Sequence, residues 1–505
     1  MRPRARAAAR LGVTMSLLVL GSCVRMTPVE RADWGAIPAD ATVRITTLNG
    51  NVRTLSQVVV STDALEGFAT EGEVPVRVPL DSIEYLENRS GPSAFPILLT
   101  IAAGIAAIAI IDASGEDPRR PAPTLVASIS CPFLYSFDGD EYVFDSETYA
   151  GAITRGLERT DLDNLDHLRA IDGTYRLRLT NERPETEYTD ALSLLVVDHP
   201  EGSAVHPDSR GSPRGFARVR GTTTATGIRG GDFTRELEAP DGRVWVGDPV
   251  ATTDLGVDSE LRDGVELTFP RPGGERALLA IHAQNTDLAA RALQMFLELQ
   301  GDDLVQWYRR VDHDPAARGQ VAAWVMREGT LHVSVWIDGA WRLQDMLLTV
   351  GPMLPKTQLA QLDIRGVTGD EVRVRIESAR GFWSLDWVAL GTEPDGELVL
   401  TSLVPSRAED ARGRDLAGIL ASADGAYYTA LEGDRVELEF LAPPPPRAGS
   451  ARTVLARSTG FYHTGTRAGG PAQTQLTERI LTEPLFGSRY LIEQLRLAAA
   501  QGAGG

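Results

Sequence analysis

The alternation of apolar and polar positions predicts short β-strands over most of the chain. In residues 40–90, the dipeptide Asn49-Gly50 separates the runs VRITTL and NVRTLSQVVVS. Because Asn-Gly readily adopts the positive φ angles of a tight hairpin turn, we expect these runs to pair as antiparallel strands. Three more runs, ALEGFA, VPVRVPL and DSIEYLE, follow them. Five strands in so short a segment predict a small β-barrel at residues 40–90.

An apolar segment follows this predicted barrel. The chain carries no charged residue between Arg89 and Asp112. The run is close to the minimum of about 17 residues that crosses a bilayer as a helix. We therefore expect a hydrophobic helix at 95–112, which either spans a membrane or lies buried or along a membrane surface. The proline-rich residues 113–123 are expected to form a linker.

The segment 124–310 is expected to be a β-rich domain with short helices. Its first run, CPFLYSFDGDEYVFD, predicts a hairpin of two aromatic-rich strands with Asp138-Gly139 in the turn. Near its end, DLAARALQMFLELQ (287–300) and DLVQWYRRVD (303–312) place apolar residues at helical spacing. These two runs therefore predict helices.

Strand-like alternation returns from Val321. The runs are VAAWVM, LHVSVWID, WRLQDMLLTV, QLAQLDI, EVRVRIES and FWSLDWVAL, separated by Gly or Asp turns. They predict a β-sandwich at 320–392. Residues 393–505 are expected to add a C-terminal β segment that ends in a helix at RYLIEQLRLAAA. The predicted fold class is mainly β, with a small N-terminal barrel, a hydrophobic helix, and β-sandwich-type domains carrying a few helices.

The N-terminal residues have the features of an export signal. Four arginines within the first ten residues precede the apolar run Leu11–Leu20, which has the length of a signal-peptide core. The tetrapeptide LGSC, ending at Cys23, resembles the lipobox of bacterial lipoproteins. The resemblance implies a signal peptide at 1–22, acylation of Cys23 with chains such as palmitate, and a tether at 23–39. By a further resemblance to the sorting rule of enteric bacteria, Val24 favours the outer membrane of the cell envelope.

Composition narrows the range of partners. The formal net charge is -19, and removal of the four signal arginines takes it to -23. Nucleic-acid backbones are bound mainly by clustered Lys and Arg, so an acidic chain without a basic stretch is not expected to bind nucleic acid. Lys356 is the only lysine, which we interpret as codon bias towards arginine. With Cys23 acylated, Cys131 is the only remaining thiol, so no internal disulfide is expected.

Tryptophan provides the clearest candidate for ligand binding. Five of the eight tryptophans lie in the predicted sandwich, at Trp324, Trp336, Trp341, Trp383 and Trp387, and the last four are the candidate ligand-binding residues. Such a group can form a platform on which sugar rings stack, and the alternative is that the rings fill the core. The spacing of Trp383 and Trp387 predicts that both lie on one strand face together with Leu385.

The sequence contains no pattern typical of a catalytic or metal site. Asp161, Asp163 and Asp166 lie close together, but they lack the glycine of a calcium loop. The seven histidines are scattered, and G-x-S-x-G, G-x-x-x-x-G-K and G-x-G-x-x-G are all missing. We therefore expect no metal, no cofactor, no catalytic residue and no enzymatic activity.

Two resemblances cover parts of the chain. CPF with its aromatic strand and Asp-Gly turn, followed by DGTYRLRLT and VVDHP, resembles a module of poorly characterised bacterial proteins, some of which carry ASPIC/UnbV-like domains. It covers about residues 125–200 and implies no activity. The predicted barrel at 40–90 resembles Sm-like or SH3-like barrels. An Sm-like barrel would imply RNA binding, against which export and acidity both argue.

These observations predict a membrane-anchored envelope lipoprotein that binds or scaffolds an envelope component or a polysaccharide. Its membrane contact would be the lipid at Cys23 together with the helix at 95–112. One alternative is a subunit of a larger membrane assembly. A second alternative is a hydrolase whose acidic pair is not recognisable in the sequence, and this alternative requires carboxylates that converge in a pocket with shifted pKa values.

Overall fold

The computed structural model describes residues 25–28, 34, 37, 41–47, 52–61, 64–69, 75–90, 132–247, 261–466 and 468–502. The predictions for Cys23, for the helix at 95–112 and for the linker at 113–123 lie outside these ranges. Among the described residues, no helix is both long enough and apolar enough to cross a membrane. The chain divides into two compact units, Met1–Ala103 and Gly104–Gly505.

The first unit is one antiparallel sheet that is nearly closed into a barrel, as expected. The prediction of a tether at 23–39 is wrong for Arg25–Pro28, because these residues form a strand that pairs with the last strand of the sheet. Its neighbours run in the order β1-β6-β2-β3-β4-β5. The elements are β1 (Arg25–Pro28), β2 (Thr42–Thr47), β3 (Val52–Val60), β4 (Ala64–Ala69), β5 (Pro75–Pro79), a 3-10 turn η2 (Leu80–Ser82) and β6 (Ile83–Ser90). Alternate apolar side chains such as Val43, Ile45 and Leu55 are fully buried and form its core.

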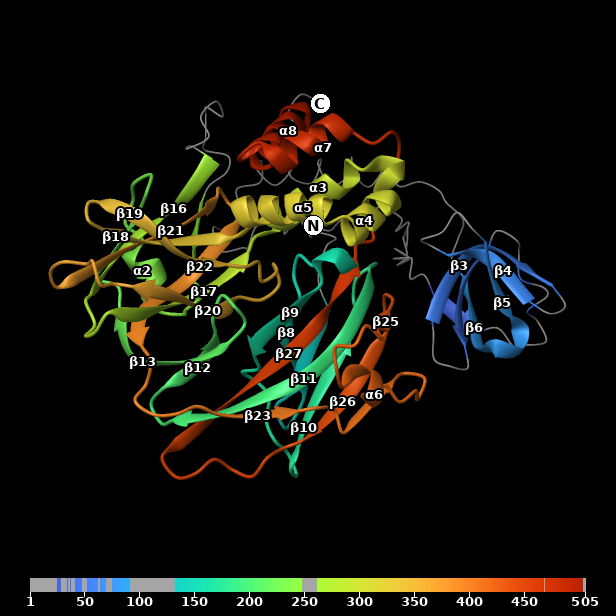
Figure 1. The fold of residues 1–505 in the computed structure, drawn as a ribbon, viewed down its shortest axis with the longest axis horizontal. Coiled ribbons are helices and arrows are strands. Elements are labelled where there is room, and N and C mark those ends of the chain that lie inside the picture. The colour runs from blue at the N-terminus through green and yellow to red at the C-terminus, as the bar shows by residue number, and fades with distance from the viewer. Residues whose placement is uncertain are drawn as a thin grey trace, which may run out of the picture. The chain divides into compact units, whose positions relative to one another are not determined.

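The second unit contains a β-sandwich that we call the outer sandwich, because another sandwich is inserted within its sequence (Figure 1). One sheet has the order β24-β26-β10-β7-β8, and the other β23-β11-β27-β9 with β25 beside β11. The strands are β7 (Phe133–Phe137), β8 (Tyr142–Glu147), β9 (Arg159–Asn164), β10 (Thr174–Thr180), β11 (Thr186–Pro200), β23 (Val399–Leu403), β24 (Arg407–Asp410), β25 (Tyr428–Ala430), β26 (Arg435–Leu441) and β27 (Ser450–His463), with the short helices η3 (Arg155–Leu157) and α6 (Ala417–Leu420) between them.

The inserted sandwich lies between β11 and β23 in the sequence. Its sheets have the orders β12-β13-β22-β17-β20, with β15 beside β22, and β14-β16-β21-β18-β19. The elements are β12 (Ala204–Pro207), β13 (Pro213–Gly221), β14 (Thr224–Gly227), α2 (Thr234–Leu237), β15 (Trp245–Val246), β16 (Arg262–Pro270), β17 (Arg276–Asn285), β18 (Leu331–Ile337), β19 (Ala340–Leu347), β20 (Lys356–Asp363), β21 (Glu371–Ala379) and β22 (Trp383–Thr392).

The order of these strands changes how the chain is divided. Residues 320–392 do not form a sandwich by themselves, because β18–β22 share their sheets with β13, β16 and β17 from the segment 124–310. Strand β11 likewise pairs along its length with β27, from 393–505. Each strand needs a neighbour for its backbone hydrogen bonds, and here that neighbour is far away in the sequence.

A layer of helices covers the place where the two sandwiches meet (Figure 1). It consists of α3 (Asp287–Glu298), η5 (Gly301–Asp303), α4 (Leu304–His313), α5 (Pro315–Trp324), a π-helical turn η6 (Val325–Gly329), α7 (Thr474–Thr482) and α8 (Phe486–Gly502). The expected helices at 287–300 and 303–312 correspond to α3 and α4. Helix α3 begins at a cap, where the side chain of Thr286 accepts a hydrogen bond from the Ala289 amide.

The prediction of a strand at VAAWVM is wrong. These residues continue α5 and the π-helical turn after it. Asp314 caps the start of the helix, because its side chain accepts a hydrogen bond from the Ala316 amide, and Pro315 occupies the first turn. The buried Val321 and Trp324 are three residues apart, so they fall on one face of a helix and pack into the helical layer.

Candidate functional site

The four candidate tryptophans do not form one group. Trp383 is only 1% exposed in the core of the inserted sandwich, where its indole nitrogen donates to the Gly329 carbonyl at 2.9 Å. Trp387 lies on the opposite face of the same strand, beside a small apolar cluster that includes Phe216. Trp336 and Trp341 lie together on β18 and β19. Of the four tryptophans, only Trp336 and Trp341 can therefore form a platform for a sugar ring together.

A β-bulge separates Trp387 from Trp383. In the pairing of β22 with β17, Trp387 lies opposite His282 and Leu385 lies opposite Ala283, so Asp386 is an extra residue. One extra residue reverses the alternation of side chains. The prediction that Trp383 and Trp387 share a face with Leu385 is thus wrong for Trp387 and right for the other two, which are both in the core.

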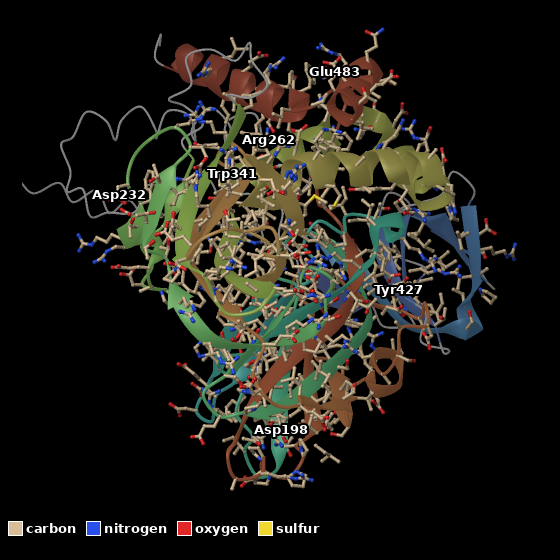
Figure 2. The ribbon with its side chains drawn as sticks, turned by 60° about the vertical axis from the view of Figure 1, so that its left-hand side comes forward. Asp198, Asp232, Arg262, Trp341, Tyr427 and Glu483 are labelled. Carbon is tan, nitrogen blue, oxygen red and sulfur yellow. The ribbon has the colours of Figure 1, made fainter. Side chains whose placement is uncertain are left out.

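Trp336 and Trp341 lie on the outer face of the sheet formed by β14, β16, β21, β18 and β19. Their neighbours Val333 and Val335 are fully buried and point into the sandwich, so Trp336 points outward. The two rings are half-buried and meet edge to face, with centroids 5.2 Å apart. Figure 2 labels Trp341 on β19 together with Arg262 on β16 of the same sheet.

Charged side chains complete this face. The Arg373 guanidinium lies 5.0 Å from the Trp336 ring and 5.4 Å from the Trp341 ring, and Arg375 lies 4.4 Å from Trp341. Both arginines also pair with the Glu266 carboxylate. Cation–π contacts and ion pairs hold the two indoles in a fixed arrangement. We call Trp336, Trp341, Arg373, Arg375 and Glu266 the aromatic face. The tryptophans could be found from the sequence, whereas the arginines could not.

A cavity of about 90 Å³ lies where the two sandwiches meet the helical layer. We call it the junction cavity. Its lining is mostly apolar, from the outer sandwich (Ala150, Ile153), the inserted sandwich (Phe382) and the helices (Ala289, Leu293, Trp324). Because three parts of the fold build it, no local sequence pattern indicates it.

Two carboxylates, Glu147 and Glu328, also line the junction cavity. Carboxylates that converge in a pocket are what the hydrolase alternative requires, so the contacts of these two are of interest. Glu147 accepts from the Met353 amide at 2.9 Å. Glu328 accepts from the Ser488 amide and hydroxyl at 3.0 and 2.7 Å, in the first turn of α8. Burial raises the pKa of Glu328, and the bonds from Ser488 oppose this. These hydrogen bonds connect both carboxylates to the backbone of neighbouring segments.

The only lysine of the chain is buried between the two sandwiches. Lys356, on β20, has its ammonium 3.0 Å from the Asp163 carboxylate on β9 and also donates to the Glu147 carbonyl. Ser146 donates to the same carboxylate at 2.5 Å. Burial alone would lower the pKa of Lys356, but the carboxylates of Asp163 and Asp161 outweigh it and raise that pKa. We call the ion pair of Lys356 and Asp163 the inter-sandwich ion pair.

Of the three aspartates that lie close together in the sequence, Asp161 and Asp163 form ion pairs with basic side chains. Asp163 pairs with Lys356, and Asp161 pairs with Arg159. Asp166 is exposed. Within the described ranges, no group of three or more His, Cys, Asp or Glu residues is arranged to hold a metal ion. Cys23, the expected lipidation site, lies outside the described residues.

A polar groove on the helical layer is separate from the junction cavity. A groove of about 550 Å³ lies between α4, α5 and α7, lined by Gln306, Arg310, Gln320 and Glu478 among others. Its floor includes Trp307, which is 4% exposed. Exposed amides and charges of this kind are ordinary on a solvated helical surface.

Comparisons with known proteins show no family. No family model matches the chain, and no curated protein matches it. Among solved structures, similar ones include a β-porphyranase of glycoside hydrolase family 86 from Bacteroides plebeius (TM-score 0.17, 7% identity), a family 31 α-xylosidase from Xanthomonas citri (0.15, 10%) and an uncharacterised Listeria monocytogenes protein solved with glucose, magnesium and calcium (0.16, 10%).

These matches cover 52, 86 and 68% of this chain, and the chain spans 40, 38 and 30% of those proteins. At such TM-scores the likeness carries no argument about fold or activity.

Proposed function

We propose that this protein is a non-enzymatic, lipid-anchored envelope protein that binds glycan chains on its aromatic face. The observation that carries the proposal is the pair of half-buried indoles on the outer side of a sheet, with two arginines and a carboxylate beside them. Buried tryptophans serve the core, but Trp336 and Trp341 contribute nothing to the interior of the inserted sandwich.

The chemistry of this face suits a sugar. A pyranose ring has a C–H face that packs on an aromatic ring and hydroxyl groups around its edge that exchange hydrogen bonds. Indoles provide a rigid apolar contact at low entropic cost. Arg373 and Glu266 lie within reach of the same rings and supply a donor and an acceptor. Since the arginines already hold the indoles in place, little side-chain freedom remains to be lost on binding.

The sequence supports the anchored location. The LGSC tetrapeptide predicts cleavage before Cys23, so a lipid on Cys23 would hold the mature chain at the membrane surface, with Val24 favouring the outer membrane. Such an anchor places a glycan-binding face beside envelope polysaccharides. A lipid attached at Cys23 would be detected by mass spectrometry, and Cys23→Ser should release the protein from membranes.

The glycan proposal is tested with the full-length protein on a panel of immobilised envelope and plant polysaccharides. We expect saturable retention by at least one glycan, with Trp336→Ala and Trp341→Ala each weakening the Kd by about tenfold or more, which corresponds to about 1.4 kcal/mol. The control is Tyr142→Ala on the outer sandwich, because Tyr142 has the same arginine contact, with the Arg178 guanidinium 4.0 Å from its ring.

Three results would contradict the proposal. The first is no retention by any glycan. The second is an equal loss in Tyr142→Ala, which would show a general effect on the protein. The third is unchanged binding in the tryptophan variants with a loss in Gln306→Ala, which would move the glycan to the polar groove.

One observation favours the alternative of an assembly subunit. Strand β23 lies at the edge of its sheet, and it exposes Val399 by 59% and Leu400 by 49%. An open edge with apolar side chains can pair with an extended segment of a partner protein. If it does so, Leu400→Lys should abolish co-purification with a membrane complex while leaving glycan binding intact. Co-purification that survives this change excludes β23 as the contact.

A further inference from the structure

The junction cavity contains a buried hydrogen-bond donor without an acceptor. Asn285, at the end of β17, is 4% exposed and lines the cavity. Its side-chain oxygen accepts from the Val350 and Gly351 amides at 2.9 and 3.2 Å, which identifies the oxygen and nitrogen ends of the amide. Among the described residues, the side-chain nitrogen has no hydrogen-bond partner. Leaving a buried donor unpaired costs about 1–3 kcal/mol.

The size of the cavity limits what can meet this donor. The volume of about 90 Å³ is smaller than the roughly 150 Å³ of a cavity that binds benzene, so it encloses a group of about four non-hydrogen atoms. The lining is mostly apolar, so most of such a group must be apolar too. Leu157, Leu293 and Val325 line the cavity and are partly exposed, which gives a group access from outside.

The carboxylates restrict the charge of the occupant. Glu147 and Glu328 would repel an anion. Glu147 accepts a hydrogen bond from the Met353 amide, and one oxygen of Glu328 accepts from Ser488. The other oxygen of Glu328 has no hydrogen-bond partner among the described residues, but it lies 3.9 Å from the Arg327 guanidinium, which already supplies a positive charge. An acceptor on a neutral group is what the Asn285 nitrogen needs.

We propose that the junction cavity binds a small neutral acyl group, with its methyl- or ethyl-sized part in the apolar lining and its carbonyl oxygen accepting a hydrogen bond from the Asn285 side-chain nitrogen. Two sources share this chemistry. One is a free carbonyl compound, and the other is an acetamido group at the end of a larger molecule such as an N-acetylated sugar. This site is separate from the aromatic face, and the inference does not depend on the glycan proposal.

The experiment uses the full-length protein and two matched pairs of probes. 2-Butanone is compared with sec-butylamine, and N-acetylglucosamine with glucosamine, so each carbonyl compound is paired with an amine of related shape. Binding is measured by isothermal titration, and the position of the probe by crystallography. We expect a Kd in the millimolar range, because about four enclosed atoms have few contacts to contribute.

Variants locate the binding. Asn285→Asp keeps an oxygen that accepts from Val350 and Gly351 but removes the donor, and we expect the Kd to weaken tenfold or more. Ala289→Met fills the cavity and should abolish binding. The control, Ala323→Met, makes the same change on the exposed side of α5 and should bind as the unchanged protein does. Melting temperatures of all variants verify that they are folded.

The possible outcomes either support one of the two ligand sources or overturn the inference. Binding of 2-butanone that is lost in the two cavity variants supports a free carbonyl ligand. Binding of N-acetylglucosamine but not glucosamine, with the same losses, supports an acetamido group. Failure of both carbonyl probes, equal affinity in Asn285→Asp, or equal binding of the amines overturns the inference. Because none of the variants touches Trp336 or Trp341, a failure here leaves the glycan test unaffected.

Discussion

Removing the Lys356 ammonium should uncouple the two sandwiches. Lys356→Met keeps the length of the side chain, but it leaves the Asp163 carboxylate buried without its partner 3.0 Å away. The side chains of the pair are only 6 and 9% exposed, so water cannot replace the lost contact. Loss of one member of such a pair destabilises a protein by about 3–5 kcal/mol. We expect a decrease of that size in the free energy of unfolding of the second unit.

The assay is urea unfolding followed by tryptophan fluorescence, with a surface ion pair as the control. Arg365→Met breaks the pair of Arg365 with Asp363, whose side chains are 66 and 41% exposed. Exposed pairs contribute about 0–1 kcal/mol, so this control should change little. The double variant Lys356→Met/Asp163→Leu removes both charges and should recover most of the stability lost in the single variant.

The dependence on pH provides a second measurement. Burial raises the pKa of Asp163, and the Lys356 ammonium opposes this. Without the ammonium, that pKa rises further. A carboxyl with a raised folded pKa contributes full stability below its unfolded pKa of about 3.9 and loses it as pH rises through the folded value. The deficit of Lys356→Met should therefore grow from pH 4 towards pH 8. A deficit independent of pH, or no larger than that of Arg365→Met, would refute the role of the inter-sandwich ion pair.

Three further predictions test other parts of the fold. Gly351→Ala should destabilise the protein by about 2–4 kcal/mol in thermal unfolding, because Gly351 has φ +96° and an added Cβ would lie 2.2 Å from the Glu147 carboxylate; a neutral effect would contradict that contact. Glu187→Gln should stabilise the protein at pH 8 but not near pH 4, because burial and neighbouring carboxylates raise the pKa of Glu187 well above its ordinary value, and the unchanged protein loses stability as pH rises through it. Trp383→Ala should cost about 3–5 kcal/mol and Trp336→Ala no more than about 1 kcal/mol in urea unfolding; equal costs would contradict their different burial.

Local patterns in the sequence determined many of the elements. The turn at Asp138-Gly139 joins β7 and β8 as expected, and the alternation in EVRVRIES is β21, whose Val372, Val374 and Ile376 are fully buried. The helical spacing of residues 287–300 corresponds to α3. These features depend on the period of side chains along one strand or helix, which a sequence displays directly.

Only the tertiary structure decided which strands pair and where side chains meet. Strands β11 and β23 are neighbours in one sheet although the whole inserted sandwich lies between them in the sequence. The bulge at Asp386 moved Trp387 to the other face, and a bulge exists only relative to a partner strand. Lys356 was unusual in the sequence as the only lysine, but its pairing with Asp163 depends on the contact between sandwiches. Long-range pairing is set by mutual burial of distant apolar faces. The local period of a sequence predicts that a strand has an apolar face, but it does not indicate which distant strand becomes its partner.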